Sequence, residues 1–146
     1  MIRAVLDTNI LASGAIARRG TMAAILDAWR GQAFTLIVSQ VILAERGRTL
    51  QNPYFATRLS PALREGFLDL VPREAVVVPL RVTVTGVATH PEDDLILATA
   101  VSGHADYLVT GDQPFQNLGR YQHVRIISPG EFLTLLKETT AEDTAA

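Results

Sequence analysis

The amino-acid sequence predicts an α/β protein in which helices cover both faces of a parallel sheet, a three-layer α/β/α sandwich. Short apolar segments rich in β-branched residues alternate along the chain with longer segments of helical periodicity. Strands separated by helices pair in parallel, because each crossover helix returns the chain to the same end of the sheet. The 146 residues have the length of one domain, and we find no internal repeat or linker.

The first predicted strand is the apolar run Ala4–Leu6, which ends abruptly at Asp7. A short helix, Ile10–Ala17, follows and is interrupted at Arg18-Arg19-Gly20. The next helix is predicted at Thr21–Arg30, with Gly31 as its C-terminal stop. Its apolar residues recur at helical spacing: Met22, Ile25, Leu26 and Trp29. We expect Trp29 to pack in the core.

The second predicted strand is Phe34–Val38, on its length and its β-branched content. Ser39 is a suitable N-cap for the helix Gln40–Leu50, which Asn52-Pro53 then ends. A short helical turn is expected at Tyr54–Leu59. Ser60 at the cap and Pro61 at the first position predict a further helix that reaches about Val71.

The second half of the chain continues the alternation. Thr89 and Glu92 have capping-box spacing and predict the start of a helix that runs to Ser102, with Gly103 as its stop. The last helix is predicted at Gly130–Lys137, after Ser128-Pro129. The remaining predicted strands are Ala75–Val78, Tyr107–Val109 and His123–Ile127, with a weaker extended segment at Val82–Val87.

Composition limits the class of protein. The hydrophobic content of 48% and charged content of 19% predict a folded globule. No apolar run is long enough to span a membrane, and the absence of cysteine fits a reducing cytoplasm. The net charge is −2, but three of the acids lie in the tail beyond Lys137. Apart from Lys137, all the Lys and Arg residues are arginines. Arginine suits bidentate phosphate contacts, although a solvated surface is the alternative for Arg18, Arg19, Arg46 and Arg48.

Acidic residues follow several predicted strands or lie in the helices after them. Asp7 directly ends the first strand, and Asp112 follows the fourth in Leu108-Val-Thr-Gly-Asp112. Glu45 shares a side of its helix with Val41 and Ile42. Asp93 and Asp94 begin an apolar helix, and periodicity alone does not choose between them. Taken singly, the acids of a turn or a first helical turn have ordinary structural explanations.

Taken together, these acids predict a metal site. The carboxyl ends of parallel strands are where α/β sheets bind ligands, and carboxylates meeting there repel one another unless a cation lies among them. Carboxylate and water oxygens are ligands of Mg²⁺ or Mn²⁺. Polar neighbours could orient these ligands, with turn or cap hydrogen bonds as the alternative role: Thr8, Asn9, Ser39 and Thr110.

The ordered set of motifs resembles a PIN-domain protein, and in particular the VapC-like toxin component of a bacterial type II toxin–antitoxin system. The resemblance covers almost the whole length, to about Lys137. It implies a PIN-like domain at residues 1–137, followed by a disordered acidic tail at 138–146. The motifs are Leu6-Asp-Thr-Asn9, Ser39-x5-Glu45, Asp93-x6-Ala100 and Leu108-Val-Thr-Gly-Asp112.

The resemblance also implies the site and the activity. It implies a five-stranded parallel sheet and a divalent-metal-dependent endoribonuclease, a hydrolase that cuts RNA phosphodiester bonds. The residues carried over as catalytic and metal-binding are Asp7, Glu45, Asp93 and Asp112. The spacing to Ala100 favours Asp93, and Asp94 is a possible auxiliary metal ligand. The last motif often reads Asp-x-Asp, whereas Pro114 stands here at the second acidic position, which leaves a second metal in doubt.

We expect Mg²⁺ or Mn²⁺ as the cofactor and RNA as the substrate, with Arg46 or Arg48 drawing a phosphate toward Glu45. The family further implies an antitoxin partner, a homodimer and a cytoplasmic location without a membrane. The alternatives are a PIN nuclease of RNA processing, a non-catalytic PIN-like module that binds RNA or protein, and a phosphoacceptor switch. The last expects a lysine after a later strand, and the only lysine is Lys137.

Other catalytic classes find no support in the sequence. The three histidines, His90, His104 and His123, lack ligand spacing and are interpreted as surface or capping residues. The same scatter argues against a Ser/His/Asp triad. The glycines form neither a Walker motif nor a dinucleotide fingerprint.

Overall fold

A computed structural model of the protein describes residues 1–145, with side chains described as far as Thr139. Within these residues, a six-stranded sheet has the order β3-β2-β1-β4-β6-β5. Neighbouring strands pair in parallel except β5, which is antiparallel to β6. The predicted five-stranded parallel sheet is confirmed, and β5 extends it. The strands are β1 (Arg3–Leu6), β2 (Thr35–Val38), β3 (Val76–Val77), β4 (Tyr107–Val109), β5 (Arg120–Tyr121) and β6 (Val124–Ile127).

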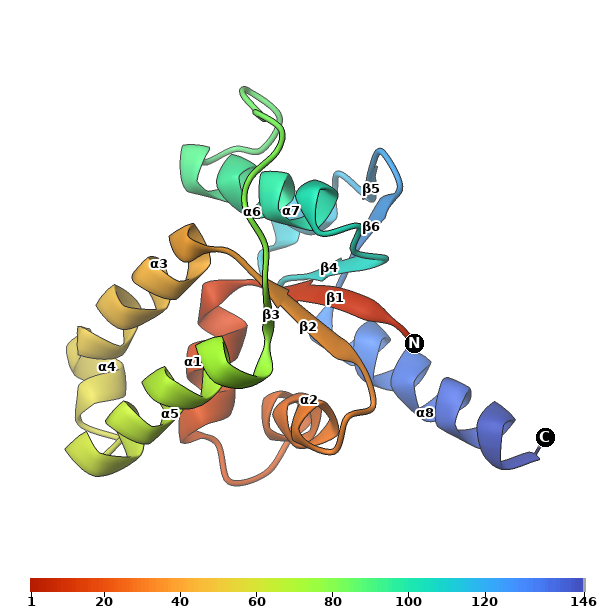
Figure 1. The fold of residues 1–146 in the computed structure, drawn as a ribbon. Helices are drawn as coiled ribbons and strands as arrows, with labels where there is room; N and C mark the ends of the chain where they lie inside the picture. Colours follow the sequence, from red (N-terminus) through yellow and green to blue (C-terminus); the bar gives the residue numbers. More distant parts are fainter. Residues whose placement is uncertain (146) are drawn as a thin grey trace.

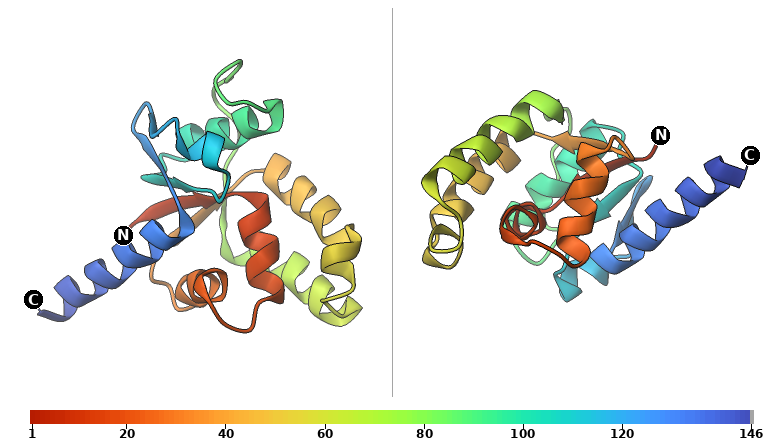
Figure 2. Two further views of the ribbon diagram at one scale, coloured as in Figure 1. Left: turned by 180° about the vertical axis from the view of Figure 1, so that it is seen from behind. Right: turned by 90° about the horizontal axis from the view of Figure 1, so that it is seen from below.

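Helices cover both faces of this sheet, as the sequence predicts. α6 packs over β1, β2 and β4 on one face, whereas α1, α2 and α8 lie on the other (Figure 1). α3, α4 and α5 form an arm beside the β3 edge, which is clearest from behind and from below (Figure 2). The helices are α1 (Thr8–Ile16), α2 (Thr21–Arg30), α3 (Gln40–Gln51), α4 (Pro53–Ala56), α5 (Pro61–Glu74), α6 (Pro91–Ser102), α7 (Gln113–Gln116) and α8 (Pro129–Ala145).

The central strands are buried on both faces, which explains why they are apolar throughout. Val5 and Leu6 of β1 are fully buried, and so are their partners Leu108 and Val109 in β4. Trp29 of α2 is only 5% exposed and belongs to the same core, as predicted. The core therefore fixes β1 beside β4 in one register.

Most predicted helix boundaries are confirmed. Ser60 caps α5, accepting a hydrogen bond from the Leu63 N–H at 3.3 Å, and Pro61 occupies the first turn. Gly31 and Gly103 are the C-caps of α2 and α6. At Gly103 an added Cβ would collide with the Ile37 side chain, so a residue without a side chain lets α6 approach β2.

Three sequence predictions are wrong in detail. α6 begins at Pro91 with His90 as its N-cap and no side-chain capping bond, so Thr89 and Glu92 form no capping box. The segment Val82–Val87 is a loop without strand pairing. α5 continues past Val71 and through Pro72 to Glu74.

The end of the chain is more helical than the sequence predicts. α8 begins at Pro129 and continues past Lys137 to Ala145, extending away from the sheet (Figure 1). The last residue, 146, lies outside the described residues. The division of the chain at residue 137 therefore stays a prediction. Among the described residues, no helix has both the length and the apolar character that a bilayer span requires.

Candidate functional site

The register of β1 and β4 brings two of the predicted acids to one edge of the sheet. Leu6 pairs with Val109, so Asp7 and Thr110 follow their strands at the same level. The Asp7 backbone N–H donates to the Val109 carbonyl at 3.0 Å, and the Thr110 hydroxyl donates to Asp7 Oδ2 at 2.7 Å. The turn that continues from Thr110 to Asp112 is thereby held beside Asp7.

The Asp7 carboxylate is enclosed and partly satisfied. Its Oδ1 accepts the Ile10 N–H at 3.2 Å, which caps α1, and the residue is only 8% exposed. Burial raises the pKa of Asp7, and the charge of Asp112 adds to this, while the hydrogen bonds from Thr110 and Ile10 act in the opposite direction. A carboxylate with a raised pKa beside another acid is the environment that a bound cation relieves.

Thr110 connects Asp7 and Asp112 through one hydroxyl group. Its Oγ1 donates to Asp7 and accepts the Asp112 backbone N–H at 3.1 Å. The Asp112 carboxylate caps α7 by accepting the Phe115 N–H at 3.0 Å. Gln116 in turn donates from Nε2 to the Thr110 carbonyl at 2.8 Å. These bonds restrain both acids, and Thr110 makes a turn hydrogen bond as well as the bond to Asp7, so its role toward a metal stays a prediction.

Asp93 approaches the same place from the first turn of α6. It is half-buried, and desolvation raises its pKa to about 6, with further contributions from the charges of Asp7 and Asp112. His90 and Glu92 act on the same pKa in opposite directions, His90 lowering it and Glu92 raising it. Acids from three separate elements therefore influence one another here.

A cavity of about 320 Å³ lies over these acids. Its walls come from α3 and the start of α6, and its floor from the ends of β1 and β4. All four acids of the predicted quartet line it, together with Thr8 and Asn9. The complete lining is Asp7, Thr8, Asn9, Ile42, Glu45, Thr49, His90, Glu92, Asp93, Ile96 and Asp112.

Glu45 reaches the cavity from α3 but is paired with a cation. Arg48, one helical turn away, donates from Nη2 to Glu45 Oε2 at 2.5 Å. Both side chains are well exposed, so the pair is an easily exchanged surface contact. The carboxylate is therefore free to exchange Arg48 for another cation in the cavity.

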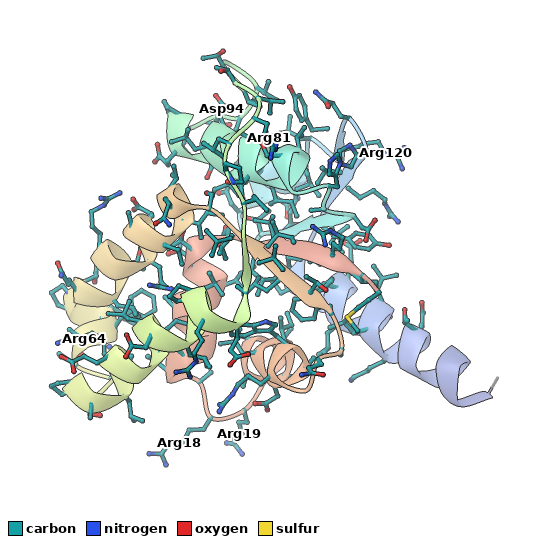
Figure 3. The ribbon with its side chains drawn as sticks, in the orientation of Figure 1. Arg18, Arg19, Arg64, Arg81, Asp94 and Arg120 are labelled. Atoms are coloured by element: carbon teal, nitrogen blue, oxygen red, sulfur yellow. The ribbon has the colours of Figure 1, made fainter. Side chains whose placement is uncertain are left out.

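Asp94 has a different environment from Asp93. It is 5% exposed, does not line the cavity, and lies beside the loop that leads into α6 (Figure 3). Its carboxylate accepts backbone N–H groups from Gly86 at 3.0 Å, Val87 at 3.3 Å and Ala88 at 2.7 Å. The structure thus gives Asp94 a role in holding this loop and does not bring it to the other acids.

Arg46 also points away from the cavity. It is 5% exposed, and its Nη2 donates to the Leu68 carbonyl of α5 at 3.2 Å. Its Nε and Nη1 are buried without a hydrogen-bond partner among the described residues, and burial lowers the pKa of the guanidinium. Arg18 and Arg19 lie in the turn between α1 and α2, far from the start of α6 (Figure 3). Of the predicted phosphate-binding arginines, Arg48 alone adjoins a cavity residue.

Ser39 is used differently from the sequence prediction. It is the N-cap residue of α3, but its side chain makes no capping bond. Its hydroxyl instead shares a hydrogen bond of 2.8 Å with the hydroxyl of Thr99 on α6. Both residues are buried, so Ser39 ties the start of α3 to α6 and supports the walls of the cavity from outside.

The cavity also contains residues that the sequence did not single out as functional. His90 and Glu92 stand at its rim, and Ile42, Thr49 and Ile96 line its walls. The position of His90 directly before Pro91 and three acids was a usable signal, because it places the imidazole at the start of the acid-bearing helix. Ile42 and Ile96 could not be recognised in the sequence as cavity residues, because apolar residues that line a cavity recur along a helix with the same spacing as apolar residues of the core.

The donor set fits Mg²⁺ or Mn²⁺ in its chemistry. Carboxylates supplied by separate elements, with neighbouring hydroxyl and amide groups, are the oxygen ligands that these hard cations take. As they stand, no three acidic or histidine side chains among the described residues are close enough to hold a metal ion. Metal binding would therefore draw the carboxylates together, and the exposed Glu45 is the one best able to move.

Comparison with known proteins identifies the family. The family model for the PIN domain matches residues 3–114, so the chain belongs to the PIN-domain family. A solved structure described as VapBC2 from Rickettsia felis bound to a DNA fragment from their promoter is similar in fold, with a TM-score of 0.59 and 16% sequence identity. The match covers 87% of this chain and 98% of the other. No curated protein matches the chain significantly in sequence. PIN domains are generally nucleases, and PIN nucleases generally use divalent metals.

Proposed function

We propose that this PIN-domain protein is a divalent-metal-dependent endoribonuclease that hydrolyses RNA phosphodiester bonds. The observation that carries the proposal is the meeting of Asp7, Asp93 and Asp112, with Glu45 opposite, around one cavity at the carboxyl edge of the sheet. Desolvation raises the pKa of Asp93, and the charges of Asp7 and Asp112 raise it further, so a cation bound there would stabilise the ionised carboxylates. Mg²⁺ or Mn²⁺ supplies that charge.

The residues of the chain then have distinct tasks. Asp7, Asp93, Asp112 and Glu45 would hold the metal, and Thr110 keeps the Asp7 carboxylate oriented through its hydrogen bond. Thr8 and Asn9 line the same cavity and are available to orient water or substrate. Asp93 must give up its proton to act as a ligand. When bound, the metal lowers the pKa of a water molecule and neutralises charge that develops on the phosphodiester.

We also propose that the nuclease is the toxin of a toxin–antitoxin pair, acting in the cytoplasm. The support is the fold shared with a VapBC2 complex, together with the complete acidic quartet. An antitoxin protein and a second copy of the chain are the partners that this proposal implies.

Cleavage of RNA tests the nuclease. Purified protein is incubated with single-stranded RNA and Mn²⁺, with and without EDTA, beside Asp7→Asn and Asp69→Asn. Asp69 is an exposed acid of α5 outside the cavity, so its variant removes the same charge without touching the site. We expect EDTA and Asp7→Asn to reduce cleavage at least about 100-fold, as loss of a preorganised charge contact in an active site does. Equal cleavage by Asp7→Asn and the wild type would refute the assignment.

Growth after induced expression tests the toxin role. We expect growth arrest by the wild type, none by Asp7→Asn, and relief when the neighbouring gene is co-expressed. An active nuclease that does not affect growth would point to RNA processing. A protein that binds RNA without cutting it, whatever metal is supplied, would point to a binding module.

A further inference from the structure

The lining of the cavity includes non-acidic side chains that the proposed metal chemistry leaves unused. Beyond the acids, its walls are Ile42 and Thr49 from α3, and His90 and Ile96 from the start of α6. Ile42 is 1% exposed and Ile96 8% exposed, so both present only a small apolar surface to the cavity. His90 is exposed and stands at the rim. These four residues contribute two apolar side chains, one hydroxyl and one flat aromatic ring to the cavity.

The charges beside these non-acidic residues disfavour a phosphate group against them. Glu45 and Glu92 line the same cavity, and no arginine or lysine lines it. Arg46 is turned into the contact between α3 and α5, and Arg48 is paired with Glu45. A neutral, planar group meets no such repulsion and gains from the apolar walls.

The size of the cavity limits what can enter. A volume of about 320 Å³ is at the lower end of the range for small-ligand pockets, about 300–1,000 Å³. It has room for a group such as one nucleobase. Proteins recognise single-stranded RNA by taking unstacked bases onto aromatic side chains, including histidine.

The backbone on both sides of His90 is restrained. Pro91 follows it and favours an extended conformation, and His90 has φ −113° and ψ 137°. The preceding residues, Gly86, Val87 and Ala88, are held by three backbone hydrogen bonds to the buried Asp94 carboxylate. The ring is therefore carried on a supported rim, which lowers the entropy lost when a base stacks on it.

We propose that His90, with Ile42 and Ile96, forms a nucleobase subsite for the nucleotide beside the scissile phosphate of single-stranded RNA. Asp94 is its positioning residue, because it fixes the loop that carries His90. This inference rests on the proposed nuclease function and adds to it the part of the substrate that the cavity recognises. The stacking face of the ring provides the contact, and its protonation is not required.

Kinetics and binding of His90 variants test the subsite. We expect His90→Ala to raise KM for a short single-stranded RNA roughly 5- to 150-fold, the equivalent of about 1–3 kcal/mol of stacking per base, with little change in kcat. His90→Phe keeps a stacking ring without an imidazole and should restore most of the loss. The control is His104→Ala, since His104 is exposed and lies outside the cavity.

Direct binding separates this proposal from the nuclease proposal. In the Asp7→Asn background, RNA affinity is measured with and without His90→Ala, for intact RNA, an RNA with one abasic nucleotide and single-stranded DNA of the same sequence. We expect His90→Ala to weaken the binding of intact RNA. It should have little effect on the binding of an RNA whose abasic nucleotide is the one that would occupy the subsite. Equal loss with DNA would show that the subsite reads the base without the 2′-hydroxyl.

Each proposal has its own contradicting result. An equal KM for His90→Ala and wild type overturns the subsite while the cleavage result stands. If His90→Phe is as impaired as His90→Ala, the contact is a hydrogen bond or charge and the stacking proposal fails. RNA binding that depends on His90, without any metal-dependent cleavage, supports the subsite and overturns the nuclease.

The role of Asp94 has a readout that a metal ligand would not share. We expect Asp94→Asn to weaken RNA binding in the same direction as His90→Ala, since an amide keeps only one acceptor for the three N–H groups. Its affinity for Mn²⁺ should equal that of the wild type, whereas Asp93→Asn should bind Mn²⁺ at least tenfold more weakly. A loss of Mn²⁺ affinity in folded Asp94→Asn, seen by circular dichroism to keep its structure, would make Asp94 a ligand instead.

Discussion

The carboxyl group of Asp93 is half-buried at the start of α6, and its surroundings raise its pKa. Desolvation is the largest cause, followed by the charges of Asp7 and Asp112, and the pKa is raised to about 6. A carboxyl that keeps its proton to pH 6 cannot bind a metal below that pH without losing the proton first. Proton and metal therefore compete for the same oxygen atoms.

Mn²⁺ affinity should consequently depend on pH through Asp93. We expect affinity to fall as the pH is lowered from 7 to 5, by about tenfold for each pH unit below 6, because one proton is displaced for each metal bound. Titration calorimetry at several pH values measures this slope. In Asp93→Asn the affinity should be low throughout and the step near pH 6 should be absent. A wild-type affinity that is constant from pH 5 to 7 would contradict the competition.

At the scale of the elements, an unforeseen contact joins α3 to α5. Pro72 lies inside α5 and has no N–H, so the carbonyl four residues earlier, Leu68, loses its helical donor. Arg46 of α3 supplies the missing bond from Nη2 at 3.2 Å. The arginine predicted to bind phosphate is instead used to satisfy a proline-interrupted helix, and it fixes α5 against the helix that carries Glu45.

A double-mutant cycle tests this coupling. Arg46→Met keeps the apolar stem but leaves the Leu68 carbonyl unpaired, and should cost about 1–2 kcal/mol of unfolding free energy. Pro72→Ala returns a backbone N–H to that carbonyl, so the same Arg46→Met change should then cost less, or even stabilise by removing buried unpaired donors. Urea unfolding of the four proteins gives the coupling energy, for which we expect about 0.5–1.5 kcal/mol. Additive effects would show that Arg46 does not replace the Pro72 donor.

The elements also show what sequence reasoning could reach. The strands and the acids at their ends were predictable. A buried strand requires a run of apolar residues, and the polar residues that follow such a run are easily recognised in the sequence. Glu45 was predictable from its helix face together with the family motif. The roles of Asp94 and Arg46 were not, because each bonds to backbone atoms of another segment, and backbone groups carry no sequence signal. The short β5 and α7 were missed because too few residues form them to show a period.

At the scale of the whole molecule, the acids that line the cavity lower the stability of the metal-free protein, because they repel one another. Asp93 keeps its proton up to about pH 6 in the folded protein, whereas the ordinary pKa of an aspartate carboxyl is 3.8. At Asp93 the folded state thus binds more protons between these values, so the contribution of Asp93 to the stability of the metal-free protein falls as the pH rises from about 4 to 6. The raised pKa of Asp7 acts in the same direction.

Asp112→Asn should therefore stabilise the metal-free protein at pH 7.5. Asparagine is as good an N-cap as aspartate, so its amide oxygen can keep the Phe115 bond while the charge that acts on Asp7 and Asp93 disappears. We expect a rise in Tm of about 2–4 °C, which corresponds to roughly 1 kcal/mol for a chain of this size.

Saturating Mn²⁺ should reverse that order. It should raise the Tm of the wild type by several degrees through preferential binding to the folded state, and raise that of Asp112→Asn much less. Scanning calorimetry in EDTA and in Mn²⁺ measures both, with Asp69→Asn as the control for loss of a distant charge. A metal-free Asp112→Asn that is less stable than the wild type would mean that its hydrogen bonds outweigh the repulsion. An equal Mn²⁺ shift in both proteins would remove Asp112 from the metal site, leaving Asp7, Asp93 and Glu45 to hold the cation.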